Sequence, residues 1–313
     1  MTDTCTATAP SSTANLGPGF DIFGLALNLF EDTVKLTRKQ TKGNKIIINR
    51  IVQSGPEIPL ETQQNSSGLV VKKMAQDFKI SDDIEIEIFK GIPSGYGLGS
   101  SAASSAAAAY AFSKLFKLKM DNNLLVDYAA EGEIASAGTK HYDNVASSLL
   151  GGFVIVRTLP KIEFIKMLPP EDLNIIVGVP QIRVPKKKTE AARNILPKNV
   201  SLDNVIQNIS NASTVVAGFA LKDVQMISKG INDMIIEPIR KELIPSYEIV
   251  KKYALDAGAL ALTISGAGPS IIAILKTDVN SKKIISAIQD GFNESHIESK
   301  VYLCKPSNGA KII

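Results

Sequence analysis

Isoleucine and glutamate alternate along Asp83–Phe89, and this period of two predicts a strand with one buried face. Ser281–Phe292 instead carries its apolar residues three and four positions apart, which predicts an amphipathic helix. The hydrophobic pattern predicts further strands at Asp32–Lys39, Lys45–Val52, Gly152–Arg157, Asn174–Val179, Leu260–Ile264 and Ser270–Leu275. It predicts further helices at Ser66–Phe78, Ser100–Phe116, Asp121–Ala137, Leu202–Lys222 and Ser246–Asp256.

The predicted strands come in small groups that are separated by helices, without a regular alternation of one strand and one helix. This order favours an α+β fold over a doubly wound parallel sheet. The chain has 313 residues, which at about 100–200 residues per domain suggests two domains. Three prolines make Leu159–Pro170 the best linker candidate. We therefore expect an N-terminal domain of residues 1–168 and a C-terminal domain of residues 169–313.

Composition excludes several classes of protein. A net charge of +4 and 6% aromatic residues argue against a nucleic-acid-binding protein. No apolar run approaches the ~18–20 residues that span a membrane, and the N-terminus resembles no secretion signal. Cys5 and Cys304 cannot build a disulfide framework, so a reducing, cytoplasmic location is expected. With only His141 and His296 as imidazoles, a histidine-rich zinc site is not expected.

A glycine-rich segment, GIPSGYGLGSSAA, follows the Asp83–Phe89 strand and opens the alanine-rich helix. Its glycines permit positive φ angles, so successive N–H groups can point at one spot, and the helix N-terminus adds partial positive charge. Ser100 and Ser101 can cap the helix, bind a phosphate oxygen or ligate Mg²⁺. No lysine follows the last glycine, so this is not a Walker A loop. The segment favours phosphate binding over a merely flexible connection with good helix caps.

Two other segments carry polar groups on tight turns. Residues 9–24 place Asn15 and Asp21 around a Gly-Pro-Gly turn, where an amide and a carboxylate suit an ammonium or hydroxyl ligand. A local network of turn hydrogen bonds is the alternative for either residue alone. Residues 260–270 form a strand that runs into a Gly-Ala-Gly-Pro turn, which by itself indicates only a tight turn of the backbone.

Together the three segments resemble a known family. APSSTANLGPGFD, PSGYGLGSSAA and SGAGPS, in this order and spacing, resemble the three motifs of the GHMP small-molecule kinases, and the resemblance covers nearly the whole chain. The first motif, His141–Ala146, Thr189–Arg193 and Glu237–Arg240 resemble the homoserine kinases most. Relatives in mevalonate and galactose metabolism usually carry a basic residue and a catalytic Asp where this chain has Asn15 and Asn144.

The resemblance implies a two-domain GHMP-kinase-like fold, with a ribosomal-protein-S5-domain-2-like ATP domain followed by a ferredoxin-like α/β sandwich. It implies ATP-dependent phosphorylation of the hydroxyl of L-homoserine to O-phospho-L-homoserine, a step of threonine biosynthesis, with Mg²⁺. Glu133 and either Ser100 or Ser101 would hold the metal. ATP would bind to the central motif, Pro93, Ser94, Gly95, Tyr96, Gly97, Leu98, Gly99, Ser100, Ser101, Ala102 and Ala103.

The resemblance also implies a site for the amino acid. Asp21 would pair with its ammonium group, and Arg193 and Arg240 would clamp its carboxylate. The chain keeps only six arginines among 35 basic residues, and carboxylate recognition is a common reason to keep an arginine. The full set of substrate residues would be Asn15, Asp21, His141, Thr189, Arg193, Arg240 and Gly266, with Asp143 nearby.

For catalysis, the resemblance places Asn144, Asp143 and Glu133 at the reacting atoms. Phosphoryl transfer passes through a loose transition state, so positioning and charge neutralisation can carry most of the rate. Asn144 cannot accept a proton, so it would orient the hydroxyl, and Asp143 is the alternative as a base.

Other interpretations stay open. The substrate could be mevalonate or a sugar, although an amino acid suits Asp21 and the two arginines best. The chain could be a non-catalytic sensor of the same fold, although such a protein should lose the serine and glutamate that hold Mg²⁺. A nucleic-acid or membrane partner is not expected, and a homodimer is left open.

Overall fold

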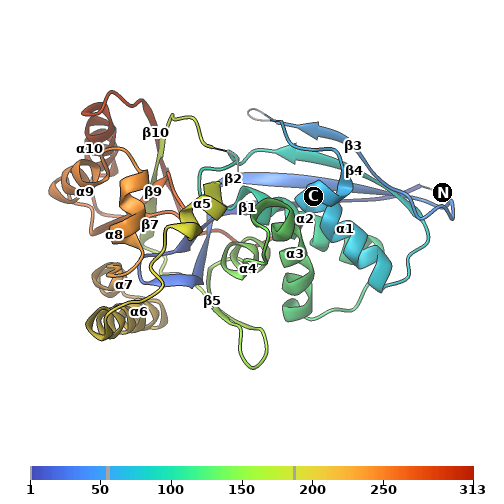
Figure 1. The fold of residues 1–313 in the computed structure, drawn as a ribbon, viewed down its shortest axis with the longest axis horizontal. Helices are drawn as coiled ribbons and strands as arrows, with labels where there is room; N and C mark the ends of the chain where they lie inside the picture. Colours follow the sequence, from blue (N-terminus) through green and yellow to red (C-terminus); the bar gives the residue numbers. More distant parts are fainter. Residues whose placement is uncertain (1, 54–56, 186–187) are drawn as a thin grey trace.

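Two β-sheets form the framework of the computed structural model, which describes residues 2–53, 57–185 and 188–313 (Figure 1). The first sheet has the order β11-β1-β2-β4-β3, and β5 joins it by pairing with β2 and β6. Among the described residues, only β3 and β4 pair in parallel. The strands are β1 (Thr2–Asn15), β2 (Gly19–Lys39), β3 (Ile46–Val52), β4 (Asp83–Lys90), β5 (Phe153–Arg157), β6 (Glu163–Met167) and β11 (Lys311–Ile312).

In the part of the chain that the structure describes, four helices pack together against this sheet. They are α1 (Ser66–Asp77), α2 (Ser100–Leu115), α3 (Asn122–Ala137) and α4 (Tyr142–Leu150), with a short 3₁₀ helix, η1 (Thr62–Gln64), before α1. The alanine-rich α2 lies at the centre and contacts α1, α3, α4 and β1. Its small side chains are almost all buried, which lets the neighbouring helices approach closely. The start of α2 is therefore fixed firmly at the end of the glycine-rich loop.

The second sheet has the antiparallel order β10-β7-β9-β8. Its strands are β7 (Leu173–Pro180), β8 (Ala261–Ile264), β9 (Ile271–Lys276) and β10 (Ser299–Cys304), and its main helices are α6 (Leu202–Leu221), α7 (Val224–Gly230), α9 (Tyr247–Asp256) and α10 (Ser281–Asn293). The shorter helices are α5 (Lys188–Asn194), α8 (Glu237–Arg240) and the 3₁₀ helix η2 (Lys241–Leu243). This strand order, with helices between β7 and β8, a β8–β9 hairpin and α10 between β9 and β10, confirms the expected ferredoxin-like unit.

Both faces of the second sheet are covered. Along β7, Ile176 packs in the same cluster as Phe292 of α10, whereas Val177 packs in the cluster that contains Phe219 of α6. Alternate residues of a strand point to opposite faces, so β7 is buried along its whole length. The helices α9 and α10 cover one face, and α6 and α7 cover the other.

The α+β class and all the predicted strands and helices are confirmed, but several elements are missing from the prediction. Neither β1 nor the first half of β2 was predicted, nor were α4, α5, α7, α8, β6, β10 and β11. The segment Leu159–Pro170, expected to be a linker, contains β6, which pairs with β5. The division at residue 168 stays a prediction, and β11 pairs with β1 across it. Within the described residues, no helix is long and apolar enough to cross a membrane.

Candidate active site

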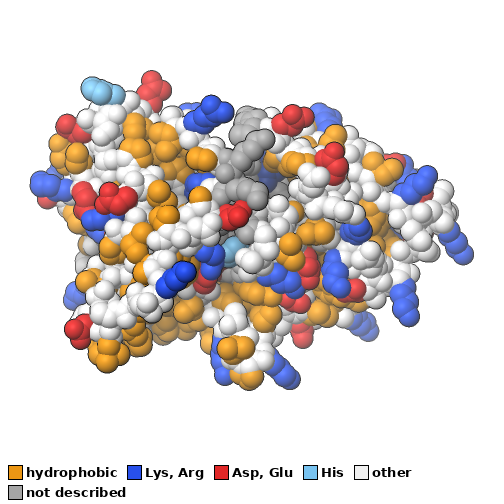
Figure 2. Space-filling view, viewed as in Figure 1, with side chains coloured by type: hydrophobic (Ala, Val, Ile, Leu, Met, Phe, Trp, Pro, Cys, Tyr) orange, Lys and Arg blue, Asp and Glu red, His pale blue; other side chains and the backbone are white. Residues whose placement is uncertain are grey.

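A cavity of about 790 Å³ opens where the loops of the two sheets meet. Its walls come from the β1–β2 turn, the glycine-rich loop, the start of α2, the end of α3, the start of α4, α5, α8 and the β8–β9 turn. Figure 2 shows acidic and basic side chains together near the centre of this face. The three motifs that the sequence singled out therefore contribute to one site.

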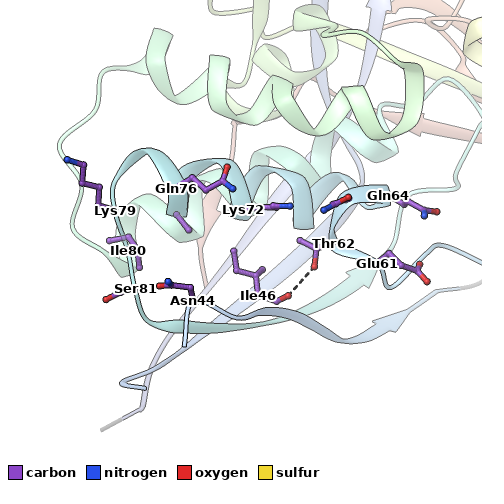
Figure 3. Close-up of a pocket in the computed structure, with 12 residues that line it drawn as sticks. Asn44, Ile46, Glu61, Thr62, Gln64, Lys72, Gln76, Lys79, Ile80 and Ser81 are labelled. Atoms are coloured by element: carbon purple, nitrogen blue, oxygen red, sulfur yellow. Dashed lines mark hydrogen bonds between the residues drawn. The ribbon is translucent and has the colours of Figure 1, made fainter. Parts of the chain in front are cut away.

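A second hollow, of about 930 Å³, lies beside α1 and β3 (Figure 3). Mostly polar side chains line it, among them Asn44, Gln76 and Lys72, and the Thr62 hydroxyl donates a hydrogen bond of 3.1 Å to the Ile46 carbonyl. No residue of the three motifs lines it, so its larger volume does not make it the reaction site.

Direct hydrogen bonds hold the three motifs together. The Ser12 N–H donates to the Leu98 carbonyl over 3.1 Å, which joins β1 to the glycine-rich loop. The Ser265 hydroxyl donates to the Gly97 carbonyl over 2.7 Å, which joins the loop to the β8–β9 turn. Segments about 80 and 170 residues apart along the chain thus share one backbone framework.

The glycine-rich loop has the conformation that the sequence suggested. Gly95, Gly97 and Gly99 have φ angles of +87°, +77° and +68°, which other residues rarely adopt. Gly99 is the N-cap of α2 and offers no side chain to accept a hydrogen bond from the first turn. The N–H groups of that turn lie at the cavity, and a helix N-terminus with free N–H groups binds anions well.

Replacing Gly97 by alanine should weaken ATP binding at least about tenfold. An added Cβ would lie 2.3 Å from the Ser265 carbonyl oxygen and 2.7 Å from that of Gly268, so the loop and the turn would have to separate. The positive φ itself costs about 1–2 kcal/mol of stability. The measurement is an ATP titration together with urea unfolding.

Gly138→Ala is the matched control, because Gly138 has a φ of +76° but nothing within 4 Å of an added Cβ. It should lose a similar amount of stability and keep its ATP affinity. Equal ATP affinities in the two variants would contradict the packing argument.

The two serines at the start of α2 have different partners. The Ser101 hydroxyl donates to Glu133 Oε1 over 2.5 Å, whereas the Ser100 hydroxyl donates to the Ile92 carbonyl over 3.0 Å. Burial raises the pKa of Glu133 to about 7, although Ser101 and the charge of Lys90 oppose the shift. Carboxylate and hydroxyl oxygens are hard ligands that suit Mg²⁺, with phosphates and waters completing the shell. The donor set therefore fits the metal.

Opposite the loop, Asp21 and Arg193 form an ion pair. One Arg193 nitrogen lies 2.9 and 2.7 Å from the two carboxylate oxygens of Asp21, and both side chains are about 40% exposed. The Asn15 side chain accepts a hydrogen bond from the Asp21 N–H and donates one to the Gly266 carbonyl over 2.9 Å. The sequence placed Asp21 and Arg193 at the substrate's two charged groups but did not predict that they pair with each other.

Arg240 is buried, with 4% of its surface exposed. Its guanidinium donates to the Gly266 carbonyl over 3.1 Å and to the Ala192 carbonyl over 3.4 Å, and it lies 4.9 Å from the centre of the Phe20 ring. Burial lowers the pKa of Arg240. It has no carboxylate partner in the described part of the chain, so a buried cation is available to a bound carboxylate.

The start of α4 brings three further predicted residues to the cavity. Asp143 is buried, and burial, followed by the charge of Asp21, raises its pKa to about 7. Neither ring nitrogen of His141 has a hydrogen-bond partner among the described residues, and burial lowers its pKa. The side-chain oxygen of Asn144 accepts a hydrogen bond from the Ser12 hydroxyl over 3.0 Å, which holds the amide in place.

The structure does not describe the side chain of one predicted site residue, and it brings to the cavity a residue that was not predicted. Thr189 belongs to α5, but its side chain lies outside the described residues. Its neighbour Lys188 lines the cavity and donates to the Gly268 carbonyl. Burial, followed by the charge of Arg240, lowers the pKa of Lys188 to about 7. Nothing in the local sequence shows that this lysine is partly buried at the cavity.

A buried ion pair below the loop was also missed. Lys90 bonds to Asp32, the Ser100 carbonyl and the Ser104 hydroxyl. Asp32 accepts hydrogen bonds from the N–H groups of Gly91 and Ile92, each over 3.0 Å. The pair fixes both ends of the glycine-rich loop. Only the pairing of β2 with β4 brings these charges together, so no local pattern could reveal them.

Comparison with known proteins agrees with this geometry. The family model for the GHMP kinases N terminal domain matches residues 65–152, and that for the GHMP kinases C terminal domain matches residues 215–294. A homoserine kinase of Saccharolobus solfataricus is 38% identical over 98% of this chain and 97% of its own length. One from Thermoplasma volcanium is 38% identical over 90% of this chain and 87% of its own.

A solved structure is also similar. The crystal structure of homoserine kinase from Cytophaga hutchinsonii superposes with a TM-score of 0.91 at 38% identity, and the match covers 99% of this chain and 98% of that one. The likeness therefore extends over both sheets and the cavity between their loops. The chain belongs to the GHMP kinase family, as its three motifs and its two-sheet fold lead one to expect.

Proposed function

We propose that this protein transfers the γ-phosphate of ATP to the side-chain hydroxyl of L-homoserine and so forms O-phospho-L-homoserine. The observation that carries the proposal is the cavity itself, which has the glycine-rich loop and the N-terminus of α2 on one side and a cluster of both charges on the other. The relatives with 37–38% identity over most of the chain are named homoserine kinases, which supports the same substrate.

The phosphates of ATP would bind to the N–H groups of the glycine-rich loop and the first turn of α2. Ser101 and Glu133 would hold Mg²⁺ through their hydroxyl and carboxylate oxygens. When bound, the ion neutralises the charge of the phosphates during transfer. Of the two candidate serines, Ser101 is supported by its contact with Glu133. Lys188 lines the same cavity without a carboxylate partner within the described residues and adds positive charge there.

Homoserine would bind by separating an existing ion pair. Its ammonium group would take the place of Arg193 beside Asp21, and its carboxylate would lie between Arg193 and Arg240. Both guanidinium groups lie over the Phe20 ring, at 5.4 and 4.9 Å from its centre, so two positive charges lie close to one ring that lines the cavity. The ion pair thus keeps complementary charges in place for a zwitterion.

The hydroxyl of homoserine would then lie near the start of α4. Asn144 is held by Ser12 and can orient the hydroxyl through its amide N–H₂ group. Burial raises the pKa of Asp143 to about 7, so it can take the hydroxyl proton as the new bond from the hydroxyl oxygen to the γ-phosphorus forms and the bond from that phosphorus to the leaving oxygen of ADP breaks. A strong base is not required, because the transition state of phosphoryl transfer is loose.

The charges of the cavity argue against the other acceptors. Mevalonate would use the arginines but leave Asp21 without an ammonium partner, and a sugar would use neither charge. A non-catalytic sensor of the same fold would not need the serine and glutamate that fit the metal. Both Ser101 and Glu133 are in contact here.

The test is an assay of ADP release by the purified chain with homoserine, mevalonate, galactose or no acceptor, each with and without Mg²⁺. We expect release of ADP only with homoserine and Mg²⁺, together with O-phosphohomoserine in the product. Turnover with mevalonate or galactose but not with homoserine would contradict the proposed substrate. ATP binding without turnover of any acceptor would instead indicate a sensor.

The proposed location is the cytoplasm. Cys5 and Cys304 are both free, as is usual for proteins of a reducing compartment. The reaction also draws on ATP, which the cytoplasm supplies.

A further inference from the structure

The proposed site gives Lys188 no contact with either substrate. Among the described residues, the lysines and arginines that line the cavity are Lys90, Lys188, Arg193 and Arg240. Lys90 and Arg193 each pair with a carboxylate, and Arg240 lies over the Phe20 ring on the substrate side. Within the described ranges, Lys188 has no carboxylate partner and donates to the Gly268 carbonyl alone. One cation of the cavity is therefore left for a further task.

Lys188 lies at the border between the nucleotide side and the substrate side of the cavity. The Gly268 carbonyl that it contacts faces the glycine-rich loop, since a Cβ on Gly97 would lie 2.7 Å from that oxygen. Two residues earlier in the same turn, the Gly266 carbonyl accepts a hydrogen bond from Arg240 over 3.1 Å. In Figure 1, α5, which begins at Lys188, lies in the middle of the view between α8 and α2. A phosphoryl group that passes from ATP to homoserine has to cross this border.

A lysine suits this position chemically. Its ammonium group is a compact charge with three donors on a flexible chain of four carbons, and lysines bind phosphates as point charges. Burial, followed by the charge of Arg240, disfavours the charged form and lowers the pKa of Lys188 to about 7. An anion beside the ammonium group would reverse this effect, so the surroundings favour a polyanion at this place. Strongly shifted pKa values in a cleft commonly mark functional groups.

We propose that Lys188 is a further catalytic residue, whose ammonium group binds the γ-phosphate of ATP and neutralises its oxygens during transfer; this inference rests on the proposed function. In the step, the bond from the γ-phosphorus to the leaving oxygen of ADP breaks as the bond to the homoserine oxygen forms, and Asp143 takes the hydroxyl proton. Lys188 stays protonated throughout, so it supplies charge and no proton. The loose transition state spreads negative charge over the oxygens of the transferring group, and a fixed cation stabilises that charge.

Lys188→Met tests this role, because methionine is unbranched and apolar and removes the charge. We expect kcat to fall about 100-fold or more, while the KM for homoserine changes less than about threefold. Lys188→Arg keeps a positive charge that binds phosphate, so it should recover at least about tenfold of the lost rate. The measurement is ADP release at saturating ATP and Mg²⁺, and thermal unfolding of each variant checks that it is folded.

Lys222→Met is the matched control. Lys222 also donates to a backbone carbonyl, that of Leu168, but it does not line the cavity. This variant should therefore keep the kcat and both KM values of the wild type.

Nucleotide affinity gives a second measurement, which needs no acceptor. The purified protein is titrated calorimetrically with ADP and with the non-hydrolysable β,γ-imido analogue of ATP, each with Mg²⁺. Lys188→Met should lose about tenfold or more in affinity for the analogue and almost none for ADP, because only the analogue has a γ-phosphate. If the wild type does not phosphorylate homoserine, the proposed function fails, and this titration still decides whether Lys188 binds the γ-phosphate.

Three results would overturn the proposal. The first is a kcat of Lys188→Met within about threefold of the wild type. The second is a raised KM for homoserine with an unchanged kcat, which would place the lysine at the carboxylate of the substrate. The third is an equal loss of affinity for ADP and for the analogue, which would show that the charge acts on the nucleotide as a whole.

Discussion

Glu133→Gln should lower kcat about 100-fold or more and raise the concentration of Mg²⁺ needed for half-maximal rate. The substitution keeps the size of the side chain and its contact with the Ser101 hydroxyl, but it removes the charge that would hold the metal. Loss of one electrostatic contact to a developing charge commonly costs about 10²–10³ in kcat. The measurement is the rate of ADP release as a function of Mg²⁺ concentration at saturating homoserine.

The same variant, although less active, should be at least as stable as the wild type above about pH 7. Burial raises the pKa of Glu133 to about 7. Ionising this carboxyl is therefore less favourable in the folded protein than in the unfolded chain. The wild type therefore loses stability as the pH rises from about 4.5 to 7, and the loss is complete above about 7. In metal-free buffer at pH 8, Glu133→Gln should unfold at a temperature equal to or above that of the wild type.

Glu131→Gln is the control on the same helix. Glu131 pairs with Lys140 at 2.7 Å and does not line the cavity, so its loss should leave the Mg²⁺ dependence unchanged. A Glu133→Gln variant with the Mg²⁺ dependence of the wild type would show that the metal binds elsewhere.

Arg240→Met should raise the KM for homoserine about 100-fold or more and leave the KM for ATP nearly unchanged. Removing one partner of a buried, hydrogen-bonded charge pair typically costs about 2–5 kcal/mol, and Arg240 is the most buried cation on the substrate side of the cavity. Methionine fills a similar volume beside Phe20, so the effect should be on binding rather than on folding.

A substrate without a carboxylate makes this test specific. 3-Aminopropan-1-ol keeps the hydroxyl and the ammonium group of homoserine, so the wild type should use it poorly and Arg240→Met should use it no worse than the wild type does. Equal losses for both substrates in the variant would show that Arg240 supports the fold instead of the carboxylate. Arg157→Met is the matched control, since Arg157 pairs with Glu163 on the exposed β5–β6 hairpin.

Strong hydrophobic periodicity made part of the fold predictable. The strand β4 and the helix α10 each bury one apolar face against a core, so their periods appear in the sequence. The strand β1 has no such hydrophobic period, because residues 7–15 are all buried and consist mainly of alanine, serine and threonine. Its polar side chains bond to the backbone, as when the Ser11 hydroxyl donates to the Leu27 carbonyl. Small residues that are buried on both faces leave no period to detect.

The site was predictable only as far as its motifs extend. The glycine-rich loop has a local sequence signature, and the resemblance supplied the residues around it. The pairing of Asp21 with Arg193 joins residues 172 positions apart, and the position of Lys188 depends on α5 lying against the β8–β9 turn. Such contacts follow from the complete fold, so a local pattern cannot reveal them.

The return of the C-terminus to the first sheet has a mechanical consequence. The polypeptide passes from one sheet to the other after β6 and passes back after β10, where Pro306 bridges to Leu27 and β11 then adds to β1. The chain therefore connects the two sheets twice. A single cut between β6 and β7 would leave them joined covalently through the segment that follows β10.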